Sequence, residues 1–588
     1  MKSYAALIRS NLRLMLRDRT VLFFSFLFPL TFFFLFAQAF HALANGGAMS
    51  QVIAMVLIIG VLGNGFFGAG MRTVQDRETG VLRRFKVAPI SAAPVIVASL
   101  VSGLVAYLPT VFLFLFFGNA IYHAPYPSHL GSLIVFISLG LVAFRAVGMI
   151  VASVVNSAQE AQIVVQILYL PMLFLSGATF PVSMMPVWVQ TIAQFLPATY
   201  LFQGITSILL GGESVLKNLA SVFALLTTLA VCLLIGVKLF RWEKEEKIAK
   251  GAKWWILAVL APFFLMGVYQ TFTKQNIEKA KILERSSRRR GSELFEHVKI
   301  FVGDGSVIED GAMLIKNEKI AEVFTSPPVN TQAFEATVLE SSGKTLLPGL
   351  IDMRVHIGMS GGVDRDVTKS PYRRLAAYLY SGITAVCSVG ESAQTQVNAD
   401  KYDGARLFSC EPAQAPELSL SGAEAAYDFQ TGNPELLNRS LLRQVGPADL
   451  IASTREATMN NRGHVAVSAL PLAGQNLLKA FQSGVRLIAG SDAGNMLILH
   501  GPTIQHELEL WLKAGIPPAA ALEAATYNAA RALHADNHIG LIKKGYEATF
   551  ILLDGDPLAD ISNLQHINAV YFRGGHINRS ALFDQFKP

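Results

Sequence analysis

The sequence predicts a multidomain protein in which a polytopic α-helical membrane domain is followed by a soluble α/β domain. Of the 588 residues, 52% are hydrophobic and only 15% are charged, a composition typical of membrane proteins. Residues 1–272 contain long apolar runs without charges. Residues 273–588 instead contain short apolar segments separated by charged residues and turn signals. We therefore expect two structural halves in series.

Seven apolar runs in the first half are long enough to cross a bilayer, which needs about 20 helical residues. They are Val21–Phe40, Val52–Ala69, Ala93–Gly118, Leu130–Val155, Ala161–Phe180, Leu219–Phe240 and Trp254–Phe272. The stretch 181–200 is a candidate for a partial re-entrant hairpin. We expect six spans in a domain over 1–245, and a seventh, 254–272, inside a linker over 246–296.

The distribution of basic residues predicts how these spans are oriented, because cytoplasmic segments are rich in Lys and Arg. Cations precede the first span and follow the second, whereas 119–129 and 181–216 contain no Lys or Arg. The N-terminus is therefore expected in the cytoplasm. Six spans return the chain there at Arg241, and the seventh places the C-terminal half outside. If 254–272 only lies on the membrane surface, that half is cytoplasmic.

The net charge of +7 does not predict nucleic-acid binding. The Lys and Arg residues cluster beside the apolar spans, where they anchor a membrane protein to anionic lipid. Two of the three cysteines, Cys387 and Cys410, lie in the soluble half, so at most one pair could form there. We interpret both as core residues rather than nucleophiles, because neither has a base beside it in sequence.

The membrane half resembles the permease subunit of type-2 ABC exporters over about residues 1–245. The resemblance is carried by the basic amphipathic stretch before the first span, QDRETGVLRRFKVAPIS at 75–91 and LSGATFPVSMMPVWVQTIAQFLPATYLFQGI at 175–205. It implies a homo- or heterodimer of permease chains and a separate ATPase that contacts the loop after the second span. The residues we expect at that contact are Arg72, Asp76, Arg77, Glu78, Arg83 and Arg84.

Positive-inside anchoring alone is the alternative explanation of that basic loop. ATP would act only through the partner subunit, because this chain has no Walker motif. Gly343-Lys344-Thr345 resembles the end of one, but Val338 stands where its first glycine is required.

Arg145 is a strong charge inside a predicted span. Exposing a charge to lipid costs at least about 2.5–3.5 kcal/mol, so an intramembrane cation is a candidate functional residue. The alternatives are a side chain that reaches the membrane surface, or a span that begins or ends elsewhere.

The soluble half is expected to enclose a barrel-like segment, 346–535, between two β-rich segments, 297–345 and 536–580, that form a small β-sandwich. Short strands and Gly-Asp turns fill both β-rich segments, and apolar strands alternate with helices between them. Specific motifs here resemble the amidohydrolase superfamily, of the imidazolonepropionase and prolidase-like type, over about 297–575. These are LLPGLIDMRVHIG at 346–358, SGITAVCSVG at 381–390, VRLIAGSDAGN at 485–495 and KKGYEATFILLDGDPL at 543–557.

This resemblance implies a TIM-type barrel with Zn²⁺ or another divalent ion that activates water. Several ligands of the family are missing. Arg354 replaces the first histidine of the His-x-His pair. Ala448-Asp449-Leu450-Ile451 resembles the pattern of the family's fourth barrel strand, and Ala452 stands near the position of its bridging lysine. His356, His464 and Asp492 remain as a sparse three-ligand set, with Asp492 as the catalytic carboxylate. The alternative is that these three residues are structural remnants.

The barrel is also short. About 190 residues lie between Leu346 and Leu533, whereas a complete barrel takes about 250. We therefore expect an incomplete barrel with a remodelled stretch at 411–462. The predicted function is an exporter permease with an impaired amidohydrolase domain. The alternatives are a membrane-tethered hydrolase of C–N bonds, amide or cyclic amide, and an artificial joining of two reading frames.

Overall fold

The computed structural model divides into two compact units, Met1–Ser287 and Arg288–Pro588, and each is considered by itself. It describes residues 2–17, 27–41, 47–87, 91–122, 124–179, 185–243, 245–246, 252–289, 291–334, 336–362, 371–389, 403–411, 419–461, 467–584 and 586.

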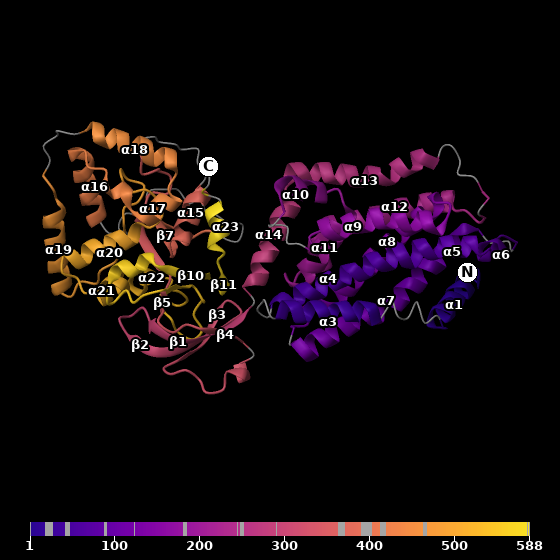
Figure 1. Ribbon diagram of the computed structural model, residues 1–588, viewed down its shortest axis with the longest axis horizontal. Helices are drawn as coiled ribbons and strands as arrows, with labels where there is room; N and C mark the ends of the chain where they lie inside the picture. The colour runs from indigo at the N-terminus through magenta and orange to yellow at the C-terminus, as the bar shows by residue number, and fades with distance from the viewer. Residues whose placement is uncertain are drawn as a thin grey trace. The chain divides into compact units, whose positions relative to one another are not determined.

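The first unit is helical (Figure 1). Its α-helices are α1 (Lys2–Arg17), α3 (Phe28–His41), α4 (Gly47–Gly63), α5 (Arg72–Glu78), α6 (Val81–Val87), α7 (Ala92–Tyr122), α8 (Leu130–Val154), α9 (Ala158–Leu175), α10 (Val187–Ala193), α11 (Pro197–Leu209), α12 (Leu219–Leu239), α13 (Ala252–Thr273) and α14 (Gln275–Arg288). A π-helix, η2 (Asn64–Met71), joins α4 to α5. Among the described residues, 5 helices are long and apolar enough to cross a membrane, or 6 if one bent pair is a single span.

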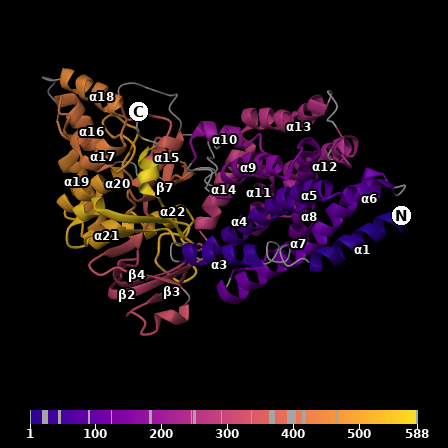
Figure 2. The same ribbon diagram turned by 45° about the vertical axis from the view of Figure 1, so that its right-hand side comes forward.

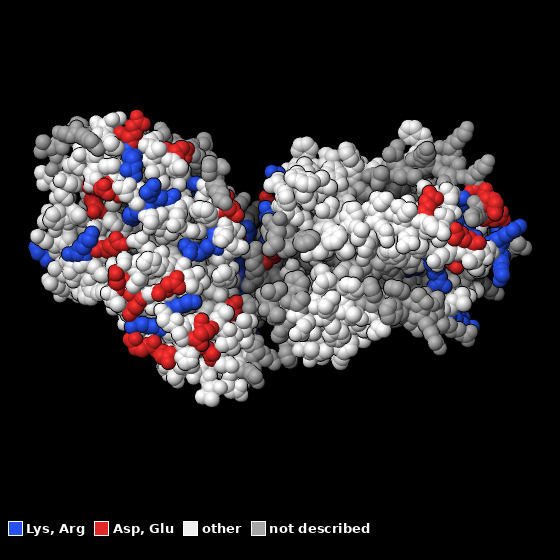
Figure 3. All heavy atoms as spheres, in the orientation of Figure 1, with Lys and Arg blue, Asp and Glu red and all other residues white. Residues whose placement is uncertain are grey.

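That bent pair is α10 and α11, which meet at 93°. It lies where the sequence predicted a partial re-entrant hairpin. The predicted first span, Val21–Phe40, falls partly outside the described residues. Uncharged side chains cover the middle of the unit in Figure 3, and charged side chains gather toward its ends, as a bilayer would require.

The second span is longer than predicted. We expected Val52–Ala69 and then a loop, but the helix runs on through η2 and α5 as one 30-residue segment, Met49–Glu78. The segment Arg72–Glu78 contains no glycine or proline that would stop a helix, and Gly80 takes a positive φ of 73° just beyond it. The connection expected as a loop is therefore largely helical, in α5 and α6.

Backbone-to-backbone packing joins η2 to α8. A side chain at Gly148 would collide with the carbonyl oxygen of Gly65, and one at Gly65 would come within 2.8 Å of Phe144. Small residues allow such close approach between membrane helices. This contact holds α8, and with it Arg145, directly against the π-helix.

The second unit contains one eight-stranded sheet built from both ends of its sequence, seen at the base of this unit in Figure 2. The strand order is β11-β10-β9-β5-β1-β2-β3, with β4 paired to β1. The strands are β1 (Ser292–Phe301), β2 (Val307–Lys316), β3 (Lys319–Phe324), β4 (Thr337–Glu340), β5 (Thr345–Pro348), β9 (Phe550–Leu553), β10 (Ile567–Phe572) and β11 (Gly575–His576).

The sequence predicted that the two β-rich segments would pack together as a small β-sandwich. In the structure they form one sheet instead. The antiparallel pair β5–β9 merges them, with Leu347 opposite Ile551. Both faces of β1 and β2 are apolar: Phe295 and Met313 join one core cluster and Leu294 and Leu314 another. Alternate side chains point to opposite faces of a strand, so a single sheet can cover two cores.

The barrel-like segment has three parallel strands, β6 (Leu350–Val355), β7 (Ile383–Val389) and β8 (Arg406–Cys410), among the residues that the structure describes. Helices account for most of the rest. They are α15 (Pro371–Tyr380), α16 (Leu420–Thr431), α17 (Ser440–Val445), α18 (Ala448–Asn460), α19 (Leu470–Gln482), α20 (Thr503–Lys513), α21 (Pro518–Ala524) and α22 (Tyr527–Ala532). One further helix, α23 (Arg579–Asp584), comes after β11.

The segment that we aligned with the fourth barrel strand is helical, so that alignment was wrong. Ala448 to Ala452 form the start of α18, after Pro447, and Asp449 lies in the first turn. An acidic residue there suits the positive end of the helix dipole. The stretch 411–462, expected to be remodelled, accordingly carries α16 to α18 in its described part.

Candidate functional site

The C-terminal unit brings two of the predicted ligands together beside its first barrel strand. The segment 489–493 runs along β6 through backbone hydrogen bonds, from Asp492 N to Arg354 O at 2.9 Å and from His356 N to Ala493 O at 2.6 Å. Asp492 adopts a left-handed φ of 64°, which aims its side chain back toward β6. The sequence predicted this neighbourhood correctly, from LIDMRVH and AGSDAG.

Arg354 binds the carboxylate that a metal would need. Its Nε donates to Asp492 Oδ1 at 2.6 Å, and His356 Nε2 lies 3.1 Å from the same oxygen. Asn495 Nδ2 donates to the other carboxylate oxygen at 2.7 Å. Burial by itself raises the pKa of Asp492, but the bonds from His356, Arg354 and Asn495 outweigh it and lower the pKa to about 2. Asp492 is therefore an anion with its charge already compensated.

The donor set at this place does not fit a metal ion. In the described part of the chain, no three His, Cys, Asp or Glu side chains are grouped so that they could hold one. His464, the third predicted ligand, lies outside the described residues. A guanidinium has no lone pair to offer, and it stands in direct contact with the carboxylate.

Asp352 holds the Asp492 segment in place. It is fully buried and accepts hydrogen bonds from Ser491 N at 2.9 Å, Ser491 Oγ at 2.5 Å and Thr503 Oγ1 at 2.9 Å. Burial raises the pKa of Asp352 to about 6, in spite of these bonds. Asp352 thus helps to position the turn that carries Asp492.

In the first unit, the residues predicted to contact an ATPase divide into buried and exposed groups. Arg77 is 3% exposed and donates to Ala152 O and Val155 O, both at 2.6 Å, so it neutralises the carboxyl end of α8. Glu78 accepts from Ala158 N at 3.1 Å, at the amino end of α9. These two residues tie α5 to the turn between α8 and α9.

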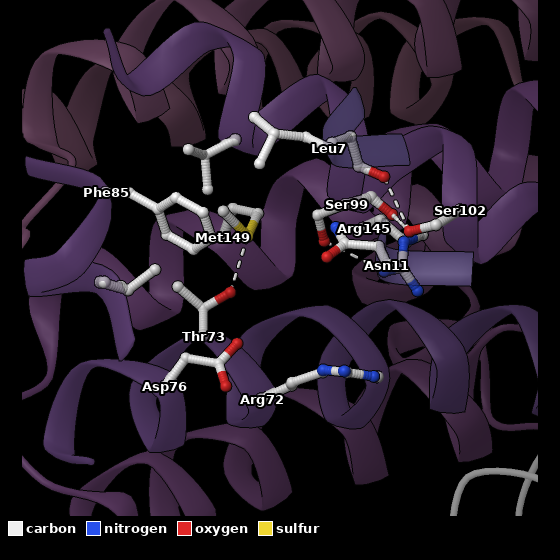
Figure 4. Close-up of a pocket in the computed structure, with 14 residues that line it drawn as sticks. Leu7, Asn11, Arg72, Thr73, Asp76, Phe85, Ser99, Ser102, Arg145 and Met149 are labelled. Atoms are coloured by element: carbon white, nitrogen blue, oxygen red, sulfur yellow. Dashed lines mark hydrogen bonds between the residues drawn. The ribbon is translucent and has the colours of Figure 1, made fainter. Parts of the chain in front are cut away.

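The other predicted contact residues lie on α6 or line a cavity. Arg83 and Arg84 are exposed on α6, and Arg83 pairs weakly with Glu243 at 3.7 Å. Arg72 and Asp76 instead line an internal cavity of about 60 Å³, which Figure 4 shows.

Arg145 lines the same cavity and is 3% exposed. Its Nη1 donates to the Asn64 side-chain oxygen and backbone carbonyl, the latter at 3.3 Å, and its Nη2 donates to Ser99 Oγ at 3.1 Å. The predicted intramembrane charge is thus buried inside the protein rather than facing lipid.

Sequence reasoning missed the partners of Arg145 and the bond between two cysteines. Asn64 stands out in an apolar run and could have been noticed as a partner for Arg145. Cys387 on β7 and Cys410 on β8 form a disulfide, with Cα atoms 5.7 Å apart. The signal was their placement on consecutive strand candidates, although a spacing alone cannot establish a bond.

Two family models match this chain. Residues 2–210 match "ABC-2 type transporter", and residues 447–576 match "Amidohydrolase family". The chain is 28% identical over 150 residues to "Probable multidrug ABC transporter permease YbhR" of Escherichia coli (strain K12), which is 25% of this chain and 39% of that protein. It is 21% identical over 220 residues to "Putative transport permease YvfS" of Bacillus subtilis (strain 168), which is 37% of this chain and 89% of that protein.

The solved structures that the chain matches include a Xaa-Pro dipeptidase, with a TM-score of 0.35, 18% identity and coverage of 49% of this chain and 100% of that chain. Phenylurea hydrolase B has a TM-score of 0.35, with 17% identity and coverage of 51% and 99%. The two family matches fall in the membrane half and in the soluble half, where the motifs predicted a permease and an amidohydrolase domain.

Proposed function

We propose that this chain, an ABC-2 transporter membrane domain with a fused amidohydrolase domain, is the permease subunit of an ABC exporter whose amidohydrolase domain does not catalyse hydrolysis. The permease works as a dimer and is driven by a separate ATPase subunit. The family match over residues 2–210 carries the transport part of this proposal.

The contact with the ATPase is assigned to the exposed cations of α6. Arg83 and Arg84 are free to meet an acidic surface, whereas Arg77 and Glu78 fasten α5 to the α8–α9 turn. Only a short turn separates α5 from α6. A displacement of α6 by the ATPase would therefore be transmitted through α5 to α8 and α9.

Copurification of an ABC ATPase with the full chain tests the transport proposal. Charge reversal of Arg83 and Arg84 together should reduce the amount of ATPase recovered by at least tenfold. Reversal of Lys217, an exposed cation in a loop predicted to be external, is the matched control. Equal recovery with all three chains would contradict the assigned contact, and failure to recover any ATPase would contradict transport.

The loss of hydrolysis rests on the Arg354–Asp492 pair. Metal-dependent hydrolysis needs an open coordination position and a ligand set of about three residues. Here a permanent cation already holds the aspartate. This arrangement therefore supports no hydrolytic step in which a bound metal activates water.

Metal analysis of the purified full chain, dialysed against Zn²⁺ and then against buffer, tests this part. We expect substoichiometric metal, equal in the wild type and in Asp492→Asn. Stoichiometric metal that disappears in Asp492→Asn would overturn the proposal and favour the membrane-tethered hydrolase.

The amidohydrolase domain is assigned to the outer side of the membrane, and the N-terminus to the cytoplasm. Two observations support this. The helix α13, Ala252–Thr273, is not among the spans counted above, but it is 22 residues long, which is the length that a crossing helix needs. The Cys387–Cys410 disulfide is of a kind that persists in oxidising compartments and is rare in the cytosol. Protease added to intact spheroplasts should therefore cleave the C-terminal domain but leave α6 untouched.

A further inference from the structure

Arg145 is a buried cation whose contacts in the structure are all with neutral groups. The described partners of its guanidinium are Asn64 and Ser99, which carry no charge. Its Nε is buried and has no hydrogen-bond partner among the described residues. A buried charge without a counter-ion is costly, and each unsatisfied buried donor adds to that cost. The donors of Arg145 thus leave capacity for a negatively charged group.

The surrounding helices are shaped to hold this guanidinium beside the cavity. A side chain at Gly103 on α7 would overlap the guanidinium, and one at Gly68 on η2 would come within 3.3 Å of Nη1. The π-helix contributes as well, since the Asn64 carbonyl at its first residue accepts from Arg145. π-Helical turns are frequently found at functional sites.

The charges that line the cavity add up to an excess of one positive charge. Arg145 and Arg72 contribute two cations, and Asp76 contributes one anion. In Figure 4 the Arg72 side chain extends to the side where Arg145 lies, while the Asp76 carboxylate points toward Thr73. Asn11, Ser99 and Ser102 supply further polar groups to the lining.

We propose that this cavity binds a single oxyanion group, a phosphate or a carboxylate, between Arg145 and Arg72. Its volume of about 60 Å³ is more than the roughly 10–15 Å³ that a cavity needs to hold one water molecule, and far below the roughly 300–1,000 Å³ of a pocket for a drug-sized ligand. It accommodates one anionic group and not a whole drug-sized molecule. The group is either the headgroup phosphate of an anionic lipid or a free small anion. This inference does not depend on transport or on an ATPase.

The test uses the purified full chain in nanodiscs and measures its thermal unfolding. One arm uses nanodiscs of zwitterionic phosphatidylcholine with inorganic phosphate or acetate added to solution at constant ionic strength. The other uses nanodiscs that contain phosphatidylglycerol, with no added phosphate or acetate. A stabilisation in the first arm alone identifies a free anion, and one in the second arm alone identifies a lipid headgroup. No stabilisation in either arm overturns the proposal.

Four variants place the effect at the cavity. The measured quantity is the anion concentration, or the anionic lipid fraction, at which half of the stabilisation is reached. Arg145→Gln and Arg72→Gln should each raise this quantity by at least tenfold. Arg13→Gln is the control and should leave this quantity unchanged. It removes an exposed cation from α1, the helix that contributes Leu7 and Asn11 to the lining. If Arg145→Gln does not fold, Arg145→Lys, which keeps the charge, should fold and bind more weakly. An unchanged response in both Arg72→Gln and the folded Arg145 variant overturns the proposal.

Discussion

Arg354 Nε lies 2.6 Å from Asp492 Oδ1. A guanidinium from the first barrel strand therefore neutralises an aspartate in the segment 489–493 that runs beside this strand. The two residues are 138 positions apart in sequence. Both side chains are mostly buried, 22% and 16% exposed, which makes the pair part of the domain's interior. Five predictions start from this pair and from similar contacts.

Replacing Arg354 by alanine should destabilise the C-terminal domain. The change leaves the Asp492 anion largely buried with fewer partners, at a cost of about 1–3 kcal/mol. Urea unfolding of the full chain, followed by a probe in the C-terminal domain, measures this loss. Arg486→Ala, at an exposed position, is the control and should have no effect. Equal midpoints for the two variants would show that the pair contributes no stability.

Acid should weaken the domain through Asp492. Its pKa in the folded chain is about 2, below its usual value of 3.8. Because folding lowers this pKa, the ionised Asp492 stabilises the fold at pH values above about 3.8. This contribution disappears as the pH falls through about 2. It amounts to at most about 2 kcal/mol. Asp492→Asn should flatten the pH dependence of unfolding between about pH 2 and 5, and an unchanged slope would speak against the pairing.

His506 should give the opposite pH dependence. It lies between Glu424, at 2.5 Å, and Glu509, at 3.5 Å. Burial lowers its pKa, but the bonds to Glu424 and Glu509 outweigh this and raise it, although Arg439 opposes them. A raised pKa contributes stability that is complete below about 6.5 and is lost as the pH rises through the folded value.

The measurement is the melting temperature of the wild type and of His506→Gln from pH 5 to 9. The variant should lose stability mainly at the acidic end. A difference that is constant across this range would rule out protonation of His506 as the cause.

Thiol counting should reveal the disulfide. Cys232 is free, whereas Cys387 and Cys410 are bonded. Chain purified without reductant and denatured should react with maleimide at one cysteine, and at three after reduction. With a separation of 23 residues, loss of the bond should cost about 3 kcal/mol. Three reactive thiols before reduction would contradict both the bond and the assigned compartment.

Arg77 should be needed for stability of the membrane domain, whereas Arg84 should not. Hydrogen bonds from a charged donor contribute about 1.5–3 kcal/mol each, and Arg77 makes two to the end of α8. Arg77→Ala should lower the melting temperature in detergent by several degrees. Arg84→Ala, the exposed control, should not. Equal melting temperatures would exclude a capping role for Arg77.

The sequence was most informative where a physical signal is local. Apolar runs identified the spans, and LIDMRVH with AGSDAG identified the segments that bring His356 and Asp492 together. It was misleading where tertiary contacts decide. Ala448 to Ala452 resembled a barrel strand by motif, yet Pro447 and Asp449 favour the start of a helix. Arg77 looked like a surface cation, and only the fold shows the carbonyls of Ala152 and Val155 that it meets.

The pairing of β5 with β9 governs when the C-terminal domain can be completed during synthesis. Leu347 on one strand faces Ile551 on the other, so the sheet cannot close before Ile551 has left the ribosome. Contacts this distant in sequence form late, and the nascent domain stays unfinished while most of it is made. Until β5 and β9 pair, the two β-rich segments of the nascent chain are not yet joined into one sheet.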